Sequence, residues 1–339
     1  MEGTMINWSY GFKSSYHMCM VDPVTWKDKE RLELESGSIS RSDEGLRQSA
    51  DIQPIEYSLG SDKFIRIWMD VRQGGESDRV ALFTGMTSAP ERKIDGASVD
   101  TPVICYSVLK DAQDIDLPRG WYAAKGIIAT DIIADLLNVC RAPVTIEAGA
   151  PRLSQHIVAE DGENHLTMTD KILDVIGWRM SISGFGEIRI GPIASKISVT
   201  FGAAENDCIE TPFTSKHDRF ACPNVMRCIK NDEACIIRDI DPESELSIVR
   251  RGREIWKTEN DVNLGDAESL ETYTRRRLKE LQSVALTASY NRSYDPRAYP
   301  SDMIRIHYPA QNVSGIFSIR SQKIQLDHCG TTAEEVDTA

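Results

Sequence analysis

The stretch that decides the fold begins at Pro223-Asn224-Val225, continues through Asp239-Ile240-Asp241-Pro242-Glu243-Ser244, and then reaches Arg251-Gly252-Arg253. A polar helix is predicted downstream over 269–285, and short strands over 303–308 and 314–320 close the segment. No catalytic constellation is present in this stretch of sequence. Its information lies in the order of its elements, which is strand, acidic loop, basic turn, helix and strands.

The predicted helix over 269–285 has one apolar stripe and one charged face. The stripe consists of Leu270, Thr274, Arg277, Leu278, Leu281 and Ala285. Arg277 fits there because its aliphatic stem can lie on apolar surface. On the charged face, Glu271 precedes Arg275 and Arg276 precedes Glu280 by four residues, a spacing that stabilises a helix by about 0.3 kcal/mol per pair. The stripe predicts a helix that covers a β structure.

Residues 121–195 are predicted to form a compact α+β insertion of helix, linker, helix and hairpin. The first helix follows from apolar residues at helical spacing, namely Ile128, Ile132, Ile133, Leu136, Leu137 and Cys140. The second is predicted to start at Thr167-Met168-Thr169-Asp170, a cap-like threonine with an acid three residues on, and to end at Gly177. Residues 178–190 alternate around Ser183-Gly184-Phe185-Gly186, which predicts a hairpin.

The first 120 residues are predicted to be β-rich. A strand over 64–69 is followed by a turn over 73–78, a returning strand over 80–85 and a further strand over 103–109. These hairpins favour a barrel or a sandwich. The chain as a whole is therefore predicted to be an α+β protein that is mainly β, with domains over 1–120, 121–195 and 196–330, one helix in the last of these, and a frayed tail over 331–339.

An internal echo connects the two β-rich regions. Ile65-Arg66-Ile67 precedes a turn and Leu82-Phe83, and Ile304-Arg305-Ile306 precedes a turn and Ile316-Phe317. The same triplet occurs again at Ile188-Arg189-Ile190, inside the insertion, where no repeat is expected. A duplicated hairpin and chance both stay open as explanations.

Composition and charge exclude several classes of protein. The chain has 339 residues, 41% hydrophobic and 27% charged, an ordinary globular composition that is long for one core. No apolar run approaches the ~18 residues of a membrane-spanning helix, and a secretory signal is not supported at the N-terminus. The net charge of −13 argues against a surface that grips DNA phosphates.

No metal site, cofactor site or catalytic residue is predicted. The eight cysteines form no Cys-x-x-Cys, and the spacing of Cys222, Cys228 and Cys235 is unusual for zinc, so we expect reduced and mostly packed thiols. The six histidines do not have metal-ligand spacing either. Paired acids are plentiful among 52 acidic residues, and the sequence does not show which of them face each other.

Two short motifs favour ordinary structural roles. Gly184-x-Gly186-x4-Gly191 has glycines like those of a dinucleotide loop, but it lies between two strands and has no helix N-terminus to receive a phosphate. Ser107 and Lys110 match the Ser-x-x-Lys spacing of some acyl enzymes, whose partner motifs are missing. A hairpin tip and a chance match are the favoured interpretations.

The charged clusters of the opening stretch are the candidate subunit interface. Its candidate residues are Arg251, Arg253, Arg275, Arg276, Asp239 and Asp241. The arginines could contact an acidic neighbour, such as a second copy of this acidic chain. A solvated loop and helix face is the alternative, and the sequence leaves both open. Aromatic residues do not interleave with these arginines, so a nucleic-acid platform is not predicted.

The ordered set of motifs resembles the tail hub, or baseplate hub, proteins of tailed phages and related contractile injection systems. The matching residues are Pro223-Asn224-Val225, Asp239–Ser244, Arg251-Gly252-Arg253, Arg276-Arg277-Leu278 and Asp302 before Met303-Ile304-Arg305. The inserted domain also matches, through Thr130–Ile133 and Asp170–Asp174 before Gly177-Trp178. The resemblance covers residues from 121 onward, about two-thirds of the chain, and its order is more specific than any single motif.

The resemblance implies a structural protein rather than an enzyme. Such hubs carry two split-barrel, tube-like domains with smaller insertions, and three copies form a ring around a lumen for DNA. The implied partners are two further copies of the chain, the hexameric tail tube or a distal tail protein, the tape-measure protein, and a trimeric spike or fibre. DNA would pass as cargo, without a membrane segment in the chain. The implied location is the tail tip or baseplate of a virion assembled in the host cytoplasm.

Two other classes stay open at this stage. One is a glycosidase or peptidase of the tail tip, acting on the cell wall through acid pairs that the sequence does not place. The other is a carbohydrate-binding or adhesin module. No segment of the chain matches a peptidoglycan-binding or hydrolytic module, so the structural hub is the favoured prediction.

Overall fold

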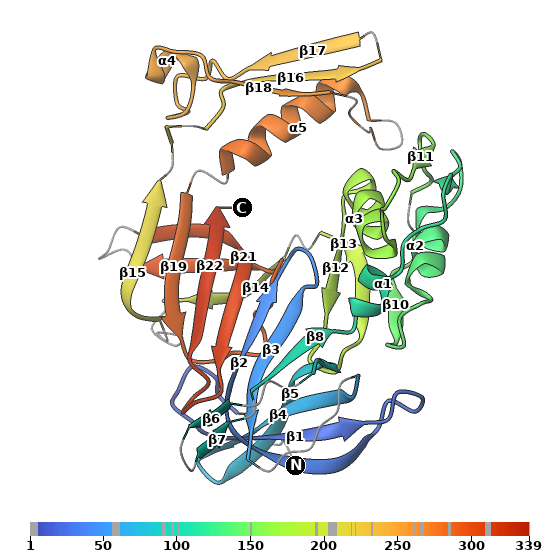
Figure 1. The fold of residues 1–339 in the computed structure, drawn as a ribbon. Helices are drawn as coiled ribbons and strands as arrows, with labels where there is room; N and C mark the ends of the chain where they lie inside the picture. Colours follow the sequence, from blue (N-terminus) through green and yellow to red (C-terminus); the bar gives the residue numbers. More distant parts are fainter. Residues whose placement is uncertain are drawn as a thin grey trace.

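A computed structural model describes residues 6–338, except 56–61, 90–92, 96–97, 101, 150, 194–195, 203–208, 218, 221, 232, 261, 263, 265–267, 284–285 and 309–312. The prediction of a mainly β, α+β fold is confirmed. Four parts are distinct in space: two curved β bodies, an inserted module of helices beside them, and a smaller module at the top of Figure 1.

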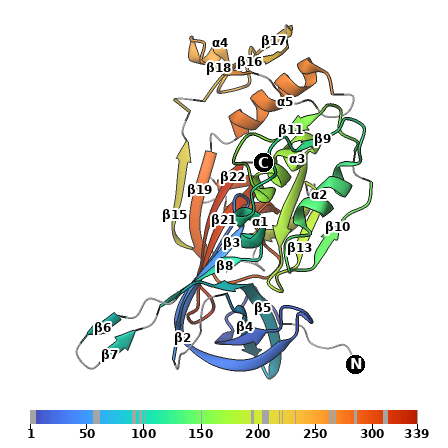
Figure 2. The ribbon, with the colours of Figure 1, turned by 45° about the vertical axis from the view of Figure 1, so that its right-hand side comes forward.

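The first β body is a curved antiparallel sheet at the bottom of Figure 1. Its strands are β1 (Lys13–Val21), β2 (Asp28–Ser42), β3 (Gln48–Pro54), β4 (Phe64–Gln73), β5 (Glu76–Thr87) and β8 (Val103–Ser107). The predicted turn after β4 is confirmed, because Gly74 and Gly75 both have positive φ there. A small hairpin of β6 (Lys93–Asp95) and β7 (Ser98–Asp100) projects away from this body, as Figure 2 shows.

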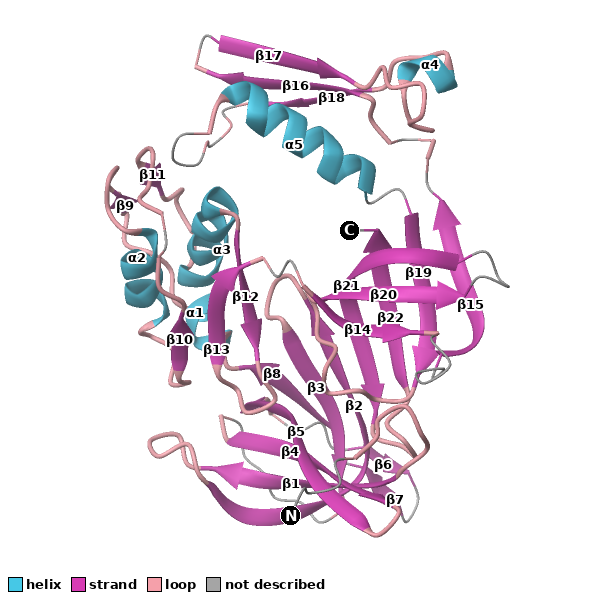
Figure 3. Ribbon diagram, turned by 180° about the vertical axis from the view of Figure 1, so that it is seen from behind, coloured by secondary structure: helices cyan, strands magenta, loops and turns pink. Residues whose placement is uncertain are grey.

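The inserted module gathers its helices on one side of the molecule, as Figure 3 shows from behind. Its elements are α1 (Lys110–Asp114), β9 (Tyr122–Ala123), α2 (Ala129–Leu137), β10 (Val144–Ile146), β11 (Ile157–Val158), α3 (His165–Ile176), β12 (Trp178–Ile182) and β13 (Ile188–Pro192). The predicted helices and hairpin are confirmed. Gly177 ends α3 in the left-handed region, at φ 67°.

The predicted start of α3 is wrong by several residues. The cap is Asn164, whose side chain accepts a hydrogen bond from the Thr167 N–H at 2.9 Å. The threonine signal was misleading because Thr167 already lies inside the helix, and its hydroxyl donates to the Asn164 Oδ1 at 3.0 Å. An asparagine is as good a cap as a threonine, so the helix gains one turn at its N-terminal end.

The second β body contains the strands that follow the inserted module. They are β14 (Ile197–Phe201), β15 (Ile209–His217), β19 (Leu286–Arg292), β20 (Met303–Tyr308), β21 (Val313–Gln325) and β22 (Thr332–Thr338). β21 is one long strand that reaches past Ile324, beyond the strand predicted over 314–320. It pairs with β20 at one end and with β2 of the first body at the other.

The frayed tail predicted over 331–339 is wrong. Residues 332–338 form β22, which pairs with β19 on one side and with β21 on the other. Alternate residues of this acidic segment point into the core, so Val336 is fully buried and Glu334 nearly so. The small and acidic composition hid this alternation, which is what a central strand requires.

The distal module, at the top of Figure 1, is built from the chain between β15 and β19. It consists of β16 (Val225–Lys230), β17 (Glu233–Arg238), α4 (Ile248–Arg251), β18 (Trp256–Glu259) and α5 (Leu270–Ser283). The predicted helix is α5, which lies against β16 and β17 through Met226, Cys228 and Leu278. The short helix α4 is a second helix in a region predicted to contain one.

The two β bodies share one continuous sheet. β2 pairs with β21 over five residues, from Ser38 opposite Gln325 to Ser42 opposite Ser321. The cores also mix at this junction, since Ile324 and Tyr294 pack with the core of the first body. The relative position of the two bodies is therefore set by main-chain hydrogen bonds, which are stiffer than side-chain contacts alone.

The echoed motifs occupy corresponding hairpins of the two bodies. In β4 and β5, Ile67 lies opposite Phe83, and in β20 and β21, Ile304 lies opposite Phe317. These four side chains are buried in the cores of their respective bodies. In each hairpin a glycine leaves room for the phenylalanine ring. In the first hairpin this glycine, Gly85, comes two residues after Phe83, and in the second, Gly315 comes two residues before Phe317.

Candidate assembly surfaces

Asn224 organises the distal module and explains the Pro-Asn-Val motif. Its side chain is fully buried and makes three hydrogen bonds to main-chain groups. Nδ2 donates to the carbonyls of Leu246 and Arg253 at 3.1 and 3.0 Å, and Oδ1 accepts from the Ile255 N–H at 2.7 Å. One amide therefore holds the acidic loop and the Arg-Gly-Arg turn against the start of β16.

Arg251 and Arg253 both bind the chain that leads into β16. Arg251 donates to the carbonyls of Cys222 and Phe220 at 2.8 and 2.9 Å, and Arg253 donates to the same Phe220 carbonyl at 2.9 Å. Between them, Gly252 ends α4 with φ 66°, a conformation that glycine adopts at little cost. The guanidinium of Arg253 also lies 4.4 Å from the centre of the Phe220 ring.

Asp239 and Asp241 shape the acidic loop. Asp239 accepts from the Ser244 hydroxyl at 2.6 Å and from Gln282 of α5 at 3.0 Å. Asp241 accepts from the Glu243 N–H at 2.9 Å. The loop is thus attached to α5 through Gln282, and its acids are bound to local donors.

Arg275 and Arg276 lie on the charged face of α5, and the predicted pairs are present. Arg275 is 2.9 Å from Glu271. Arg276 is 2.6 Å from Glu280 and 3.1 Å from Glu268. The structure therefore brings all six candidate interface residues into the distal module, and each has a partner within the chain.

Sequence reasoning missed the exposed apolar side chains of the distal module. Phe220 is 78% exposed, Ile240 66%, Val249 62% and Trp256 46%. Exposed apolar side chains are candidate contact residues, in addition to the charges that are already paired within the module. Their isolated positions in a polar segment gave no periodic signal that could have revealed them.

Replacing Asn224 with Ala is expected to loosen the distal module by about 2–4 kcal/mol, since three main-chain groups lose hydrogen bonds worth about 0.5–1.5 kcal/mol each. Hydrogen exchange at the Ile255 amide should accelerate by roughly the factor that corresponds to this free energy. Asn138→Ala, at an exposed helix end, is the control and should exchange as the wild type does. Unchanged protection of Ile255 in the Asn224 variant would contradict this role.

A hollow of about 590 Å³ lies over the junction of the two bodies. It is formed by β2, β3, β21, β22 and β19, and many of its lining side chains are small and polar: Ser40, Ser42, Ser49, Ser289 and Ser321. Three cationic residues also line it, Arg41, Arg47 and Lys323, and Arg47 is bound to Asp170 of α3 at 2.6 Å. The lining is therefore mostly neutral in a chain of high negative charge.

The hollow does not provide the acid pair that a glycosidase requires. Glu334 and Glu335 both belong to its lining, but strand alternation turns Glu334 inward, where it is paired with Arg292. Glu335 is then the one carboxylate of the lining that faces outward. Two carboxylates would have to lie ~5–9 Å apart across a shared cleft for glycoside hydrolysis.

A row of buried polar residues crosses the junction on the inner face of the same strands. Register places Arg41 of β2 beside Gln48 and Gln322, and Gln322 beside Glu334. Gln322 donates to Glu334 at 2.6 Å and to the Ala298 carbonyl at 2.9 Å. This row attaches the 293–302 loop to the shared sheet.

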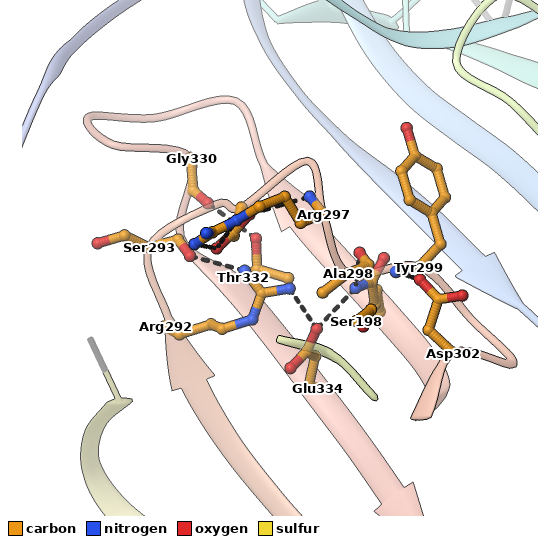
Figure 4. Close-up of polar contacts among 12 residues, drawn as sticks. Ser198, Arg292, Ser293, Arg297, Ala298, Tyr299, Asp302, Gly330, Thr332 and Glu334 are labelled. Carbon is orange, nitrogen blue, oxygen red and sulfur yellow. Dashed lines mark hydrogen bonds and ion pairs between the residues drawn. The ribbon is translucent and has the colours of Figure 1, made fainter. Parts of the chain in front are cut away.

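Arg292 and Glu334 form a fully buried ion pair in this row, and Figure 4 shows them with Ser293 and Ala298. Arg292 also donates to the Ser293 carbonyl at 2.8 Å, and its guanidinium lies 5.0 Å from the Phe201 ring centre. Asp302, which the sequence placed before a strand, accepts from the Tyr299 N–H at 2.9 Å at the turn into β20. Burial raises the pKa of Asp302 above its usual range.

Across the part of the chain that the structure describes, no three His, Cys, Asp or Glu side chains gather closely enough to hold a metal ion. Within the same residues, no helix combines the length and the apolar character needed to cross a membrane. Seven cysteines lie in this part, five of them buried as expected, and Cys208 lies outside it.

Comparisons with known proteins identify the fold. The chain matches no protein-family model and no curated protein sequence. Among solved structures, it resembles a 43 kDa tail protein of prophage MuSo2 from Shewanella oneidensis, with 14% identity, a TM-score of 0.69 and coverage of 96% of this chain and 98% of the other. A tail protein from Neisseria meningitidis aligns with 14% identity, a TM-score of 0.70 and coverage of 97% and 96%.

A more distant relative extends the comparison. It is an Escherichia coli component of the type VI secretion system, described as structurally similar to the T4 bacteriophage tail proteins gp27 and gp5. It aligns with 8% identity and a TM-score of 0.54, over 91% of this chain and 74% of the other. The chain therefore has the fold of the phage tail proteins over almost its whole length.

Proposed function

We propose that the chain is a structural hub protein of a phage tail tip or baseplate. The observation that carries this proposal is the fold shared with two tail proteins over 96–97% of the chain. In this proposal the chain joins a hexameric tail tube to a trimeric spike or fibre. It acts at the tip of a virion assembled in the host cytoplasm, with the tape-measure protein and the tube or a distal tail protein as neighbours.

The two β bodies support this role through symmetry. A ring of three copies that each present two similar bodies offers six similar surfaces to a hexameric tube, while the rest of the ring keeps threefold symmetry. We assign the two tube-like domains to the first β body, within 1–120, and to the second β body, within 196–330 with β22 added. The inserted domain is 121–195 together with α1, and the distal module lies within the second range. The shared β2–β21 pairing would hold the two domains of one copy at a constant angle.

The outward face of β3, β2, β21, β22 and β19 is the surface that we assign to a DNA lumen. Its serines present neutral hydroxyls, Arg47 at its edge is bound to Asp170, and its exposed Lys323 is accompanied by the exposed carboxylate of Glu335. Affinity for DNA comes largely from Lys and Arg that neutralise phosphates. A surface of this composition in an acidic chain would let DNA pass without retaining it.

The distal module is the surface that we assign to contacts between copies. Its exposed Phe220, Ile240, Val249 and Trp256 lie in the same module as the six candidate interface residues. Arg251 and Arg253 are poor choices for a charge-reversal test, because both hold the Phe220 carbonyl and their loss would disturb the module itself. Arg275 is a better choice, since it is 67% exposed and pairs with Glu271, one turn away on the same helix.

The proposal is tested by the mass and shape of the purified chain. Light scattering should give three times the mass of one chain at high concentration, or on addition of the tube protein, and electron microscopy should show a ring with a central opening. A chain that stays monomeric under both conditions would refute the hub.

Arg275→Glu is expected to weaken the trimer by about tenfold or more, because one charge reversal beside an acidic copy costs upwards of 1.4 kcal/mol. Folding should be unaffected, since an exposed i,i+4 pair contributes only about 0.3–0.5 kcal/mol. The double variant Glu271→Arg/Arg275→Glu restores the pair within the helix and is the matched control for folding. If the wild type and the single variant assemble equally well, Arg275 does not contribute to the interface.

A further inference from the structure

Two cysteines lie directly opposite each other in the distal module. Cys228 of β16 and Cys235 of β17 are register partners in an antiparallel pair. The same register places Lys230 opposite Glu233, as the last pair before the chain reverses. In an antiparallel hairpin of this register, the pair next to the turn is hydrogen-bonded, and hydrogen-bonded and non-hydrogen-bonded pairs then alternate along the strands. Cys228 and Cys235 are the second pair after Lys230 and Glu233, so they occupy a hydrogen-bonded position. Their Cα atoms are therefore about 5.5 Å apart.

The two thiols share one face of the sheet but differ in access. Opposite residues of an antiparallel pair point to the same side, and on that side Cys228 is fully buried with Met226 and Leu278 under α5. Cys235 is partly exposed. Burial raises the pKa of the Cys228 thiol. An oxidant from solution therefore meets Cys235 first, with Cys228 beside it.

We propose that Cys228 and Cys235 form a reversible intramolecular disulfide when the protein meets a small disulfide oxidant such as oxidised glutathione. The Cys235 thiolate attacks one sulfur of the oxidant, breaks its S–S bond and releases one glutathione. The Cys228 sulfur then gives up its proton to solvent, attacks the Cys235 sulfur and releases the second glutathione. Two protein thiols and one glutathione disulfide become one protein disulfide and two glutathione thiols.

The geometry makes this bond reversible rather than permanent. A Cα separation of about 5.5 Å suits a disulfide, but Cβ atoms of opposite strand residues lie about 4.5–5.5 Å apart, against the 3.5–4.5 Å of an unstrained disulfide. The hairpin must therefore tighten, and strain makes a disulfide easier to reduce. The inference goes beyond the proposed hub function: the site would be reduced in a cytoplasm and oxidised outside it.

Mass spectrometry of the full chain tests the proposal. The reduced protein is equilibrated with oxidised glutathione, unfolded, alkylated and digested with trypsin. Cleavage after Arg227, Lys230 and Arg238 separates Cys228–Lys230 from Asn231–Arg238. We expect these two peptides to be joined by a disulfide, with two of the eight thiols lost to alkylation and both recovered after brief treatment with reduced glutathione.

Two variants sharpen the test. Cys235→Ser should abolish the linked peptides, and Cys222→Ser, which removes another buried thiol of the same part of the chain, should leave them unchanged. Alkylation of both Cys228 and Cys235 after oxidation would overturn the proposal. Glutathione retained on Cys235 without the linkage, or linkage of either cysteine to a third one, would also overturn it.

Discussion

Arg292→Met is expected to lower the free energy of unfolding by about 3–5 kcal/mol, because removing one partner of a buried ion pair leaves the other charge uncompensated. Both side chains are fully buried, and Glu334 would keep just the hydrogen bond from Gln322. The contact with the Phe201 ring would also be lost. Urea unfolding would measure the loss, and hydrogen exchange would locate it in β19 and β22.

A double variant separates the ion pair from the packing. Arg292→Met combined with Glu334→Leu removes both charges and fills similar volume, so it should recover most of the stability lost in the single variant. If the double variant is as unstable as Arg292→Met alone, packing around the arginine stem rather than the ion pair holds the strands together. If the single variant is as stable as the wild type, the pair has no structural role.

Gly184→Ala is expected to separate the inserted module from the first β body at a cost of about 3 kcal/mol or more, the upper range for forcing atoms into packed space. A Cβ at this position would lie 1.8 Å from the Ala81 carbonyl oxygen, which is main chain and cannot rotate away. The main-chain carbonyls of this hairpin tip also accept hydrogen bonds from side chains of the first β body. Gly184 accepts from Thr84 at 2.8 Å, and Phe185 accepts from Trp26 at 2.8 Å.

The readout for Gly184→Ala is protection of the Thr84 region and of the hairpin tip from hydrogen exchange, together with the urea midpoint. Gly11→Ala is the matched control, because a Cβ there meets nothing within 4 Å and its backbone has ordinary φ. Wild-type protection at the tip of the Gly184 variant would show that the module is held elsewhere. The Arg47–Asp170 ion pair between the β2–β3 turn and α3 would then be the first alternative.

The glycines around Phe185 show how a correct local prediction can lack its physical reason. Alternation and the Ser-Gly-Phe-Gly tip identified a hairpin between β12 and β13, as the structure confirms. The glycines are needed for a different purpose, since Gly184 and Gly186 both lie against residues of β5 that are about 100 positions earlier in the chain. A local sequence pattern predicts the turn, but it does not predict which distant surface the turn packs against.

The candidate interface residues also show that the sequence does not reveal which groups a side chain will contact. The charge cluster at Arg251 and Arg253 left open a contact with another molecule or a solvated loop, and the structure places their guanidiniums on main-chain carbonyls of the same chain. Asn224, buried and central to the module, carried no signal beyond its place in the resembling motif. Whether a polar side chain binds its own chain or a neighbour depends on which segments meet in space.

The sequence by itself determined the mainly β class, the helices α2, α3 and α5, the β4–β5 and β12–β13 hairpins and the packed thiols. These features follow from periodicity and turn residues within about 20 neighbouring positions. Only the tertiary structure decided that β2 pairs with β21, that 332–338 is a strand and that Arg292 meets Glu334. Arg292 and Glu334 are 42 positions apart in the chain, and β2 and β21 are separated by far more. No local pattern records which partner each strand edge will find.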